Sequence, residues 1–269
     1  LFAIPWEGRL LVGTTDTDFE GDSDHVGAQE DEVRYLLETL QSYFPDLSLT
    51  PSDVVATFAG LRPLLGADGG ASASAVSREH RIVEEPSGLL TLIGGKLTTY
   101  RKMSEQVVDA VAAKLRTRHG IAAREACRTA RVPIRSFATD GRATGVGRAG
   151  ELGAETLRRL AVRYPGEEEV LAELVLGDPG LGEPLSPNSP YLGAEIVFAC
   201  RHEMAATLPD LMIRRTHLFY REPDQGLALA PRVAELAGRA LGWSEADRGR
   251  QLGLFEQAVG SSRGFRGGR

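Results

Sequence analysis

The stretch GGKLTTYRKM, residues Gly94 to Met103, decides the fold of this chain. The apolar run before it, Leu89 to Ile93, is typical of a strand, and the glycine pair ends that strand. After it, apolar residues recur on one helical face, which predicts an amphipathic helix from Thr99 to about Arg118. A strand, a glycine pair and a helix form the kind of backbone turn that meets a ligand at a helix N-terminus.

The residues upstream of this stretch predict a β-rich first third with one helix. Arg9 to Gly13 is a short apolar run that follows the turn Trp6-Glu7-Gly8, which indicates a hairpin. Helical spacing of apolar residues predicts a helix from Asp31 to Tyr43. The segment Val54 to Phe58 is rich in β-branched residues, and a further strand is expected from Arg81 to Glu84.

The chain from about Glu125 onward is predicted to be mostly helical. Its apolar faces include Val197, Cys200, Met204 and Leu211. The last ten residues, 260–269, carry few core-forming side chains and are expected to fray. A capping box is expected to open one of the helices at Thr207-Leu208-Pro209-Asp210. Helices are expected near 151–163, 167–176, 191–206, 208–219, 231–241 and 244–259.

Composition excludes several classes of protein. A hydrophobic content of 42% with 25% charged residues is that of a folded globular chain, and no apolar run approaches the ~20 residues of a membrane span. The net charge of −6 argues against a nucleic-acid partner. The first residues lack the basic flank of a signal peptide, and Leu1 to Pro5 resembles the inside of a strand, so we expect the chain to begin mid-domain. Two cysteines form no disulfide framework, which favours the cytoplasm.

Residues Gly145 to Gly150 match the dinucleotide-binding pattern G-x-G-x-x-G, but their context excludes that function. The motif must follow a buried strand and open a helix inside a βαβ unit. Here a polar loop, Thr139 to Thr144, precedes it.

Three segments together resemble one enzyme family. They are Gly13-Thr14-Thr15-Asp16, then Phe58 to Leu64 with Ser77 to His80 shortly after, and finally Gly94 to Met103. In this order and spacing the chain closely resembles the FAD-dependent glycerol-3-phosphate dehydrogenases. The helical remainder is similar to the C-terminal domain of that family, especially from Arg201 to Thr216.

The resemblance implies an α+β fold made of a partial FAD-dependent oxidoreductase and an all-α C-terminal domain. Residues 1–75 would form part of an antiparallel substrate-binding sheet. Residues 76–118 would be the last strands and helix of the FAD-binding domain, and residues 125–265 the helical domain. The N-terminal glycine motif of the family is absent from this sequence. We therefore expect the chain to be a fragment that is inactive alone.

The implied activity is oxidation of sn-glycerol 3-phosphate to dihydroxyacetone phosphate, with FAD as cofactor and a quinone as electron acceptor. Peripheral association with the inner face of the cytoplasmic membrane and a homodimer are further expectations. Two alternatives stay open: an oxidase that passes electrons to oxygen, and a non-catalytic remnant that acts as a binding or interaction domain. The general base has no assignment.

The cofactor-binding residues expected from the resemblance are Gly94, Gly95, Lys96, Leu97 and Thr98. Reduction of a flavin leaves negative charge on its N1–C2=O side, and a helix N-terminus offers N–H groups and a positive dipole end to such a charge. Glycines let the backbone approach closely, and Lys96 would add a full positive charge. From the residues alone, a plain turn with a solvated Lys96 is the competing interpretation.

The substrate-binding residues expected are Arg62, Arg78 and Lys96, with Arg62 and Lys96 also assigned to catalysis. Pro63 biases Arg62 toward an extended backbone, from which its planar fork can meet a phosphate or carboxylate. The competing interpretation for either arginine is an ordinary surface residue. For Asp16, capping of a turn is favoured over contact with the substrate. No cluster of residues has the spacing of metal ligands.

Overall fold

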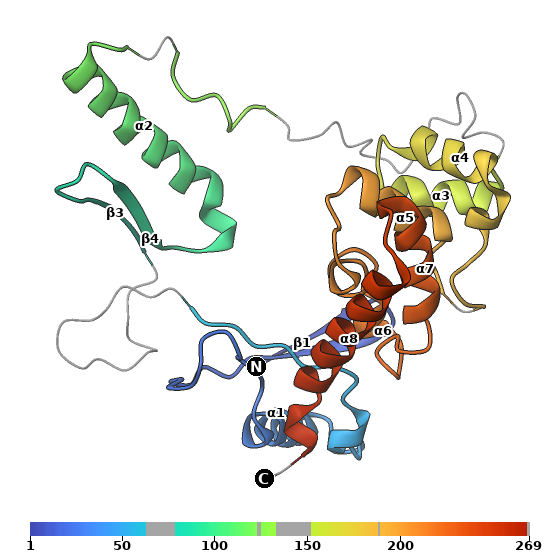
Figure 1. The fold of residues 1–269 in the computed structure, drawn as a ribbon. Helices are drawn as coiled ribbons and strands as arrows, with labels where there is room; N and C mark the ends of the chain where they lie inside the picture. The colour runs from blue at the N-terminus through green and yellow to red at the C-terminus, as the bar shows by residue number, and fades with distance from the viewer. Residues whose placement is uncertain (63–78, 123–124, 133–151, 188, 268–269) are drawn as a thin grey trace. The chain divides into compact units, whose positions relative to one another are not determined.

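The computed structural model describes residues 1–62, 79–122, 125–132, 152–187 and 189–267 (Figure 1). The chain divides into two compact units. One unit comprises Leu1–Thr15, Gly27–Ala59 and Phe137–Arg269, and the other comprises Asp16–Val26 and Gly60–Ser136. The predicted polar loop Thr139 to Thr144 and the rejected glycine motif Gly145 to Gly150 lie outside the described residues. The domain boundaries inferred from the sequence remain a prediction.

The first unit opens with the expected hairpin. Strand β1, Phe2–Trp6, pairs antiparallel with β2, Arg9–Gly13. The two residues between them have left-handed backbones, with φ of 46° at Glu7 and 78° at Gly8. Positive φ at both central positions is the requirement of the tight turn that best matches the twist of paired strands. Glycine satisfies this requirement easily, whereas a glutamate seldom occupies such a position.

Helix α1, Glu30–Tyr43, follows in this unit. The β-rich segment after it forms no strand in the described part of the chain. Instead, Thr57 is bound to Ser262 near the chain end. The Thr57 N–H donates to Ser262 Oγ at 2.9 Å, and the Thr57 hydroxyl donates to the Ser262 carbonyl at 2.7 Å. Side-chain and backbone bonds from a distant helix thus replace the strand partner that the β-propensity suggested.

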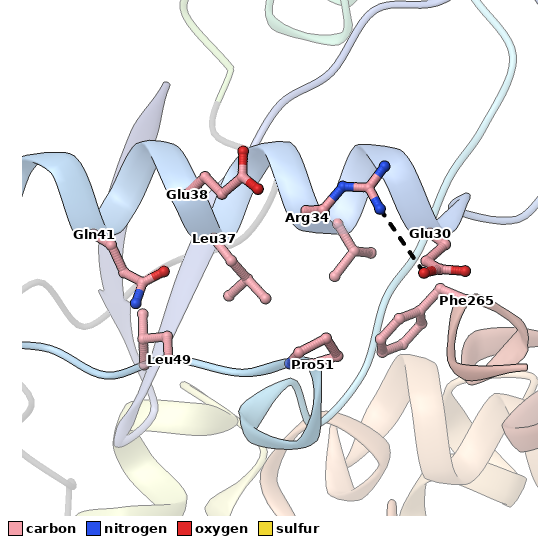
Figure 2. Close-up of a pocket in the computed structure, with 9 residues that line it drawn as sticks. Glu30, Arg34, Leu37, Glu38, Gln41, Leu49, Pro51 and Phe265 are labelled. Carbon is pink, nitrogen blue, oxygen red and sulfur yellow. Dashed lines mark ion pairs between the residues drawn. The ribbon is translucent and has the colours of Figure 1, made fainter. Parts of the chain in front are cut away.

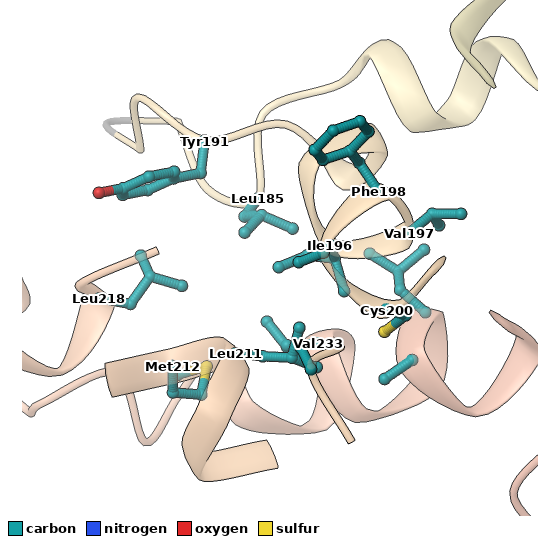
Figure 3. Packing of buried hydrophobic residues seen from close by; sticks show 14 of the residues in the cluster. Leu185, Tyr191, Ile196, Val197, Phe198, Cys200, Leu211, Met212, Leu218 and Val233 are labelled. Carbon is teal, nitrogen blue, oxygen red and sulfur yellow. The ribbon is translucent and has the colours of Figure 1, made fainter. Parts of the chain in front are cut away.

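The described remainder of this unit, from residue 152 onward, is mostly helical, as predicted, and α5 lies at its core. Every residue of α5 from Gly193 to Cys200 is buried, and Figure 3 shows Ile196, Val197 and Phe198 among the apolar side chains around it. Burial on all sides requires an apolar helix, and the residues from Gly193 to Cys200 meet this requirement except at Glu195. The helices are α3 (Ala154–Arg163), α4 (Glu168–Gly177), α5 (Gly193–His202), α6 (Leu218–Arg221), α7 (Ala230–Leu241) and α8 (Glu245–Ser262).

The prediction of a single helix near 208–219 is wrong for the second half of that range. A π-helix covers Asp210–Arg215, and α6 begins only at Leu218. Between them, both the N–H and the hydroxyl of Thr216 donate to the Leu211 carbonyl, at 3.0 and 2.8 Å, and His217 has a φ of 54°. This wide turn and left-handed residue end the helix. The capping box at its start is confirmed, because Thr207 and Asp210 exchange side-chain to backbone hydrogen bonds.

Two further expectations in the helical region fail. Met204 was assigned to an apolar face but is 91% exposed, because α5 ends at His202 and Met204 has a left-handed backbone with φ of 57°. The tail was expected to fray, yet α8 runs on to Ser262 and a 3₁₀ turn covers Gly264–Arg266. Phe265 in that turn is buried and anchors it.

The second unit contains the segment that decided the fold. Strand β3, His80–Glu84, pairs antiparallel with β4, Leu90–Gly94. The 3₁₀ turn Leu97–Thr99 then leads directly into α2, Tyr100–His119. The predicted strands and helix are therefore confirmed to within one or two residues. Together, the two antiparallel pairs and the large helical region confirm the expected α+β fold class.

Candidate functional site

The Gly94–Gly95 pair forms a turn that only glycine can make. Both residues have left-handed backbones, with φ of 76° and 87°. A Cβ on Gly94 would lie 2.7 Å from the Glu79 carbonyl oxygen, and one on Gly95 would lie 2.6 Å from the Sδ atom of Met103. The positive φ would strain any other residue at both positions, and at Gly94 the Glu79 carbonyl also leaves no space for a side chain. Two successive residues at the end of β4 therefore have no Cβ atom, directly before a helix begins.

The helix that follows begins with backbone N–H groups for which the helix itself has no carbonyl acceptor. The Thr99 N–H donates to the Lys96 carbonyl at 2.9 Å, which closes the first 3₁₀ turn. The N–H groups of Leu97 and Thr98 belong to this first turn, where an intrahelical acceptor is absent by geometry. Leu97 is 88% exposed. Among the described residues neither N–H group has an acceptor, so both are available at the helix N-terminus, beside the positive end of the α2 dipole.

Lys96 stands between the glycines and this turn, with an extended backbone and an exposed side chain. In the described part of the chain, its ammonium group forms no ion pair. By contrast, Lys102, one turn into α2, binds the Glu105 carboxylate at 2.7 Å. The charge of Lys96 is thus available at the helix N-terminus.

Arg62 binds Asp16 in the same unit. Its Nη1 atom donates to Asp16 Oδ2 at 2.6 Å, and both side chains are partly exposed. The sequence favoured a turn-capping role for Asp16 and did not predict this pair. No local pattern could reveal it, since 46 positions separate the two residues.

The predicted site residues are brought into one unit but not into direct contact. Arg62 and Gly94 to Thr98 all belong to the second unit. Among the described residues, no hydrogen bond or ion pair joins Arg62 to Lys96. Arg78 lies outside the described residues.

A hollow in the first unit is lined by none of the predicted site residues. It encloses about 230 Å³, and Figure 2 shows it between α1 and the segments that carry Leu49, Pro51 and Phe265. Within the ranges that the structure describes, no group of His, Cys, Asp and Glu side chains is arranged to hold a metal ion. No described helix combines the length and apolarity needed to cross a membrane.

Among the residues that the structure describes, the most strongly buried charged side chain, Glu195, belongs to the scaffold. Burial raises the pKa of Glu195, although Arg163 Nη1 lies 2.6 Å from its carboxylate. The other carboxylate oxygen of Glu195 accepts the Leu192 N–H at 2.7 Å, which caps α5 from within. A perturbed pKa can mark a functional site, but here one contact joins α3 to α5 and the other caps α5. We therefore assign this pair to the packing of the helical region.

Comparison with known proteins identifies both parts of the chain. Residues 61–248 match the family described as the C-terminal domain of alpha-glycerophosphate oxidase. Residues 1–101 match the family described as FAD dependent oxidoreductase. The two matches overlap across the segment that contains Arg62 and the Gly94–Gly95 turn.

Named relatives agree with these families. A glycerol-3-phosphate dehydrogenase of Synechocystis is 33% identical over 95% of this chain and 46% of its own length. An aerobic glycerol-3-phosphate dehydrogenase of Staphylococcus haemolyticus is 32% identical over 92% of this chain and 45% of its own length. The chain thus spans about half the length of these relatives.

A solved structure agrees as well. The glycerol-3-phosphate dehydrogenase of Bacillus halodurans, complexed with FAD, superimposes with a TM-score of 0.78 at 26% identity. The superposition covers 99% of this chain and 52% of that structure. The resemblance inferred from the sequence is confirmed, and the chain belongs to the family of the C-terminal domain of alpha-glycerophosphate oxidase, joined to residues of an FAD dependent oxidoreductase domain.

Proposed function

We propose that the whole protein oxidises sn-glycerol 3-phosphate to dihydroxyacetone phosphate with FAD as cofactor. The observation that carries this proposal is the Gly94–Gly95 turn, whose positive φ angles favour glycine at both positions and which leads straight into an exposed helix N-terminus. The named relatives and the FAD complex of the structural relative support the same activity.

The residues present fit a flavin. No side chain projects from Gly94 or Gly95, but the Glu79 carbonyl and the Met103 thioether fill the space on the Cβ side, so a flat ring would approach the opposite side of this backbone. The N–H groups of Leu97 and Thr98 suit an anionic ring edge, and the α2 dipole adds to their effect. When bound, FAD would accept the hydride that leaves C2 of the substrate. The protein would supply the fixed donors and charges around that transfer.

The substrate carries a phosphate and therefore needs fixed positive groups. Arg62 is our first choice for an anionic oxygen of the substrate, with Arg78 in a supporting role. One N–H of Arg62 is engaged by Asp16, which orients the guanidinium and leaves its other donors free for a ligand. Lys96 would add a positive charge beside the flavin or the reacting hydroxyl.

The test uses the protein expressed from the complete reading frame that encodes these residues. After anaerobic mixing with sn-glycerol 3-phosphate, the flavin absorbance should bleach and dihydroxyacetone phosphate should appear in equal amount. The enantiomer, sn-glycerol 1-phosphate, is the matched control and should react slowly. An absence of bleaching with a fully flavin-loaded protein would refute the proposal.

For the electron acceptor we propose a quinone, and with it a cytoplasmic protein that contacts the inner membrane face peripherally as a homodimer. The family description names an oxidase, so oxygen is the second candidate acceptor. Turnover measured with a soluble quinone under nitrogen, and peroxide formation measured in air, separate the two. Flotation with liposomes and light scattering test the membrane contact and the dimer.

A further inference from the structure

The Thr99 hydroxyl binds the backbone of Lys96 on both sides. It accepts the Lys96 N–H at 3.3 Å and donates to the Lys96 carbonyl at 2.9 Å. Since the Thr99 N–H binds the same carbonyl, Thr99 makes three contacts with the backbone of one residue. Such local side-chain bonds fix the backbone at a helix start.

The Met103 side chain covers the other end of the turn. A Cβ built on Gly95 would lie 2.6 Å from both the Sδ and the Cε atom of Met103, so these atoms rest directly on the Gly95 backbone. Met103 stands one helical turn after Thr99, on the same face of α2. Its Sδ atom lies 3.2 Å from the Thr99 hydroxyl oxygen.

These contacts distinguish two neighbouring threonines. Under the proposed function the Thr98 N–H would face the flavin, and no hydrogen bond of the Thr98 hydroxyl occurs in the described part of the chain. The Thr99 hydroxyl, by contrast, is occupied by Lys96 and lies against Met103. Thr98 and Thr99 therefore have different roles, although both are threonines.

We infer that Thr99 and Met103 are positioning residues, which hold the Gly95–Lys96 backbone in the conformation that presents Lys96 and the Leu97 and Thr98 N–H groups. This inference rests on the proposed function as far as the ligand is concerned. The hydroxyl of Thr99 fixes the Lys96 backbone. The thioether of Met103 keeps water and other side chains off Gly95 and holds the Thr99 rotamer.

The first experiment needs no flavin. Amide hydrogen exchange is measured on the 269-residue chain, at Lys96 and Thr99. Thr99→Val removes the hydroxyl at constant shape and should speed exchange at Lys96 about five- to tenfold. Thr99→Ser keeps the hydroxyl and should restore slow exchange. Thr98→Val is the matched control and should leave exchange at Lys96 unchanged. Equal exchange rates in the wild type and Thr99→Val would overturn the inferred clamp.

The second experiment uses the flavin-loaded protein from the complete reading frame. Thr99→Val and Met103→Ala should lower the flavin reduction potential and reduce kcat, with KM almost unchanged. Thr99→Ser and Met103→Leu should recover most of both. Faster amide exchange with an unchanged potential would overturn the positioning role and leave Thr99 a purely structural residue. A wild-type protein that sn-glycerol 3-phosphate fails to reduce would refute the proposed function instead, while the exchange results would stand.

Discussion

Arg62 and Asp16 meet at 2.6 Å, and this single ion pair joins two of the three sequence segments that indicated the family. Asp16 closes the segment Gly13 to Asp16, and Arg62 lies inside the segment Phe58 to Leu64. The pair is partly exposed, so its contribution to stability should be small, between 0 and about 1 kcal/mol. We expect the main effect of the ion pair to be the orientation of the Arg62 guanidinium.

Arg62→Ala should therefore damage catalysis far more than stability. If Arg62 binds an anionic oxygen of the substrate, its loss should cost about 2–5 kcal/mol in transition-state binding, measured as kcat/KM. Arg62→Lys should recover only part, because an ammonium group cannot make the two-pronged contact. Arg128, which pairs with Glu125 at 3.1 Å, provides the matched control. If Arg62→Ala and Arg128→Ala both retain wild-type kcat/KM, Arg62 has no place in the site.

Lys96→Ala should act on the flavin. If the ammonium group supports the N1 side of the ring, its removal should lower the flavin reduction potential and slow hydride transfer at saturating substrate. Lys102→Ala is the control, since Lys102 is bound to Glu105 one turn further into α2. A redox titration and stopped-flow reduction of each variant provide the measurements. If Lys96→Ala and Lys102→Ala gave the same reduction potential and the same rate of flavin reduction, Lys96 would be only a solvated surface lysine.

Local signals made most of the fold predictable. The turn glycines Gly8 and Gly88 have positive φ, and each joins two short apolar runs into a hairpin. Helix α2 was predicted to within one residue at each end, because its apolar spacing is regular and Gly120 ends it in a left-handed conformation.

Non-local contacts and irregular turns were not predictable. The pairing of Thr57 with Ser262 joins residues 205 positions apart and leaves no trace in periodicity. The helix break at His217 comes from a wide turn at Thr216, for which the sequence has no glycine or proline as a signal. Of the candidate site, the turn was predictable from its glycines, whereas the Asp16 partner of Arg62 and the task of Thr99 required coordinates.

Residues 152–267, made alone, should unfold cooperatively. Their core contains the fully buried Leu171, Phe198, Leu211 and Phe255, drawn from four helical segments. By contrast, α2 has no buried residue, so a peptide of residues 79–122 should melt broadly. Circular dichroism on heating measures both. A broad melt of the helical polypeptide would show that the hairpin and α1 are required for its fold.

Glu7 should stabilise the first unit through its carboxylate, in spite of its left-handed backbone. The carboxylate accepts from Arg221 Nη1 at 3.1 Å and lies 3.4 Å from both His217 Nδ1 and the Tyr191 hydroxyl. Glu7→Asn gives the turn a residue that it prefers, yet removes these contacts. We expect it to lower the free energy of unfolding by about 1–2 kcal/mol.

Urea denaturation of Glu7→Asn measures this difference, and Glu256→Gln on the exposed face of α8 is the control. A more stable Glu7→Asn protein would show that turn geometry outweighs the contacts of the carboxylate.

The stability of the helical region should fall in acid through Asp210. Burial disfavours the Asp210 carboxylate, but hydrogen bonds from the Thr207 hydroxyl and from the Ala206 and Thr207 N–H groups lower its pKa below the ordinary 3.8. A carboxyl group with a lowered folded pKa stabilises the protein fully above its unfolded pKa, and this contribution is lost as the pH falls through the folded value.

Thr207→Ala removes the hydrogen bond from the Thr207 hydroxyl to Asp210, so it should lower the free energy of unfolding by about 1 kcal/mol at neutral pH. The difference from the wild type should narrow as the pH drops below 3.8, because protonated Asp210 no longer gains from a donor. Thr207→Ser keeps the hydroxyl and should follow the wild type across the whole range. Urea unfolding curves at a series of pH values measure all three proteins, and a Thr207→Ala difference that stays constant in acid would show that the cap acts without the charge of Asp210.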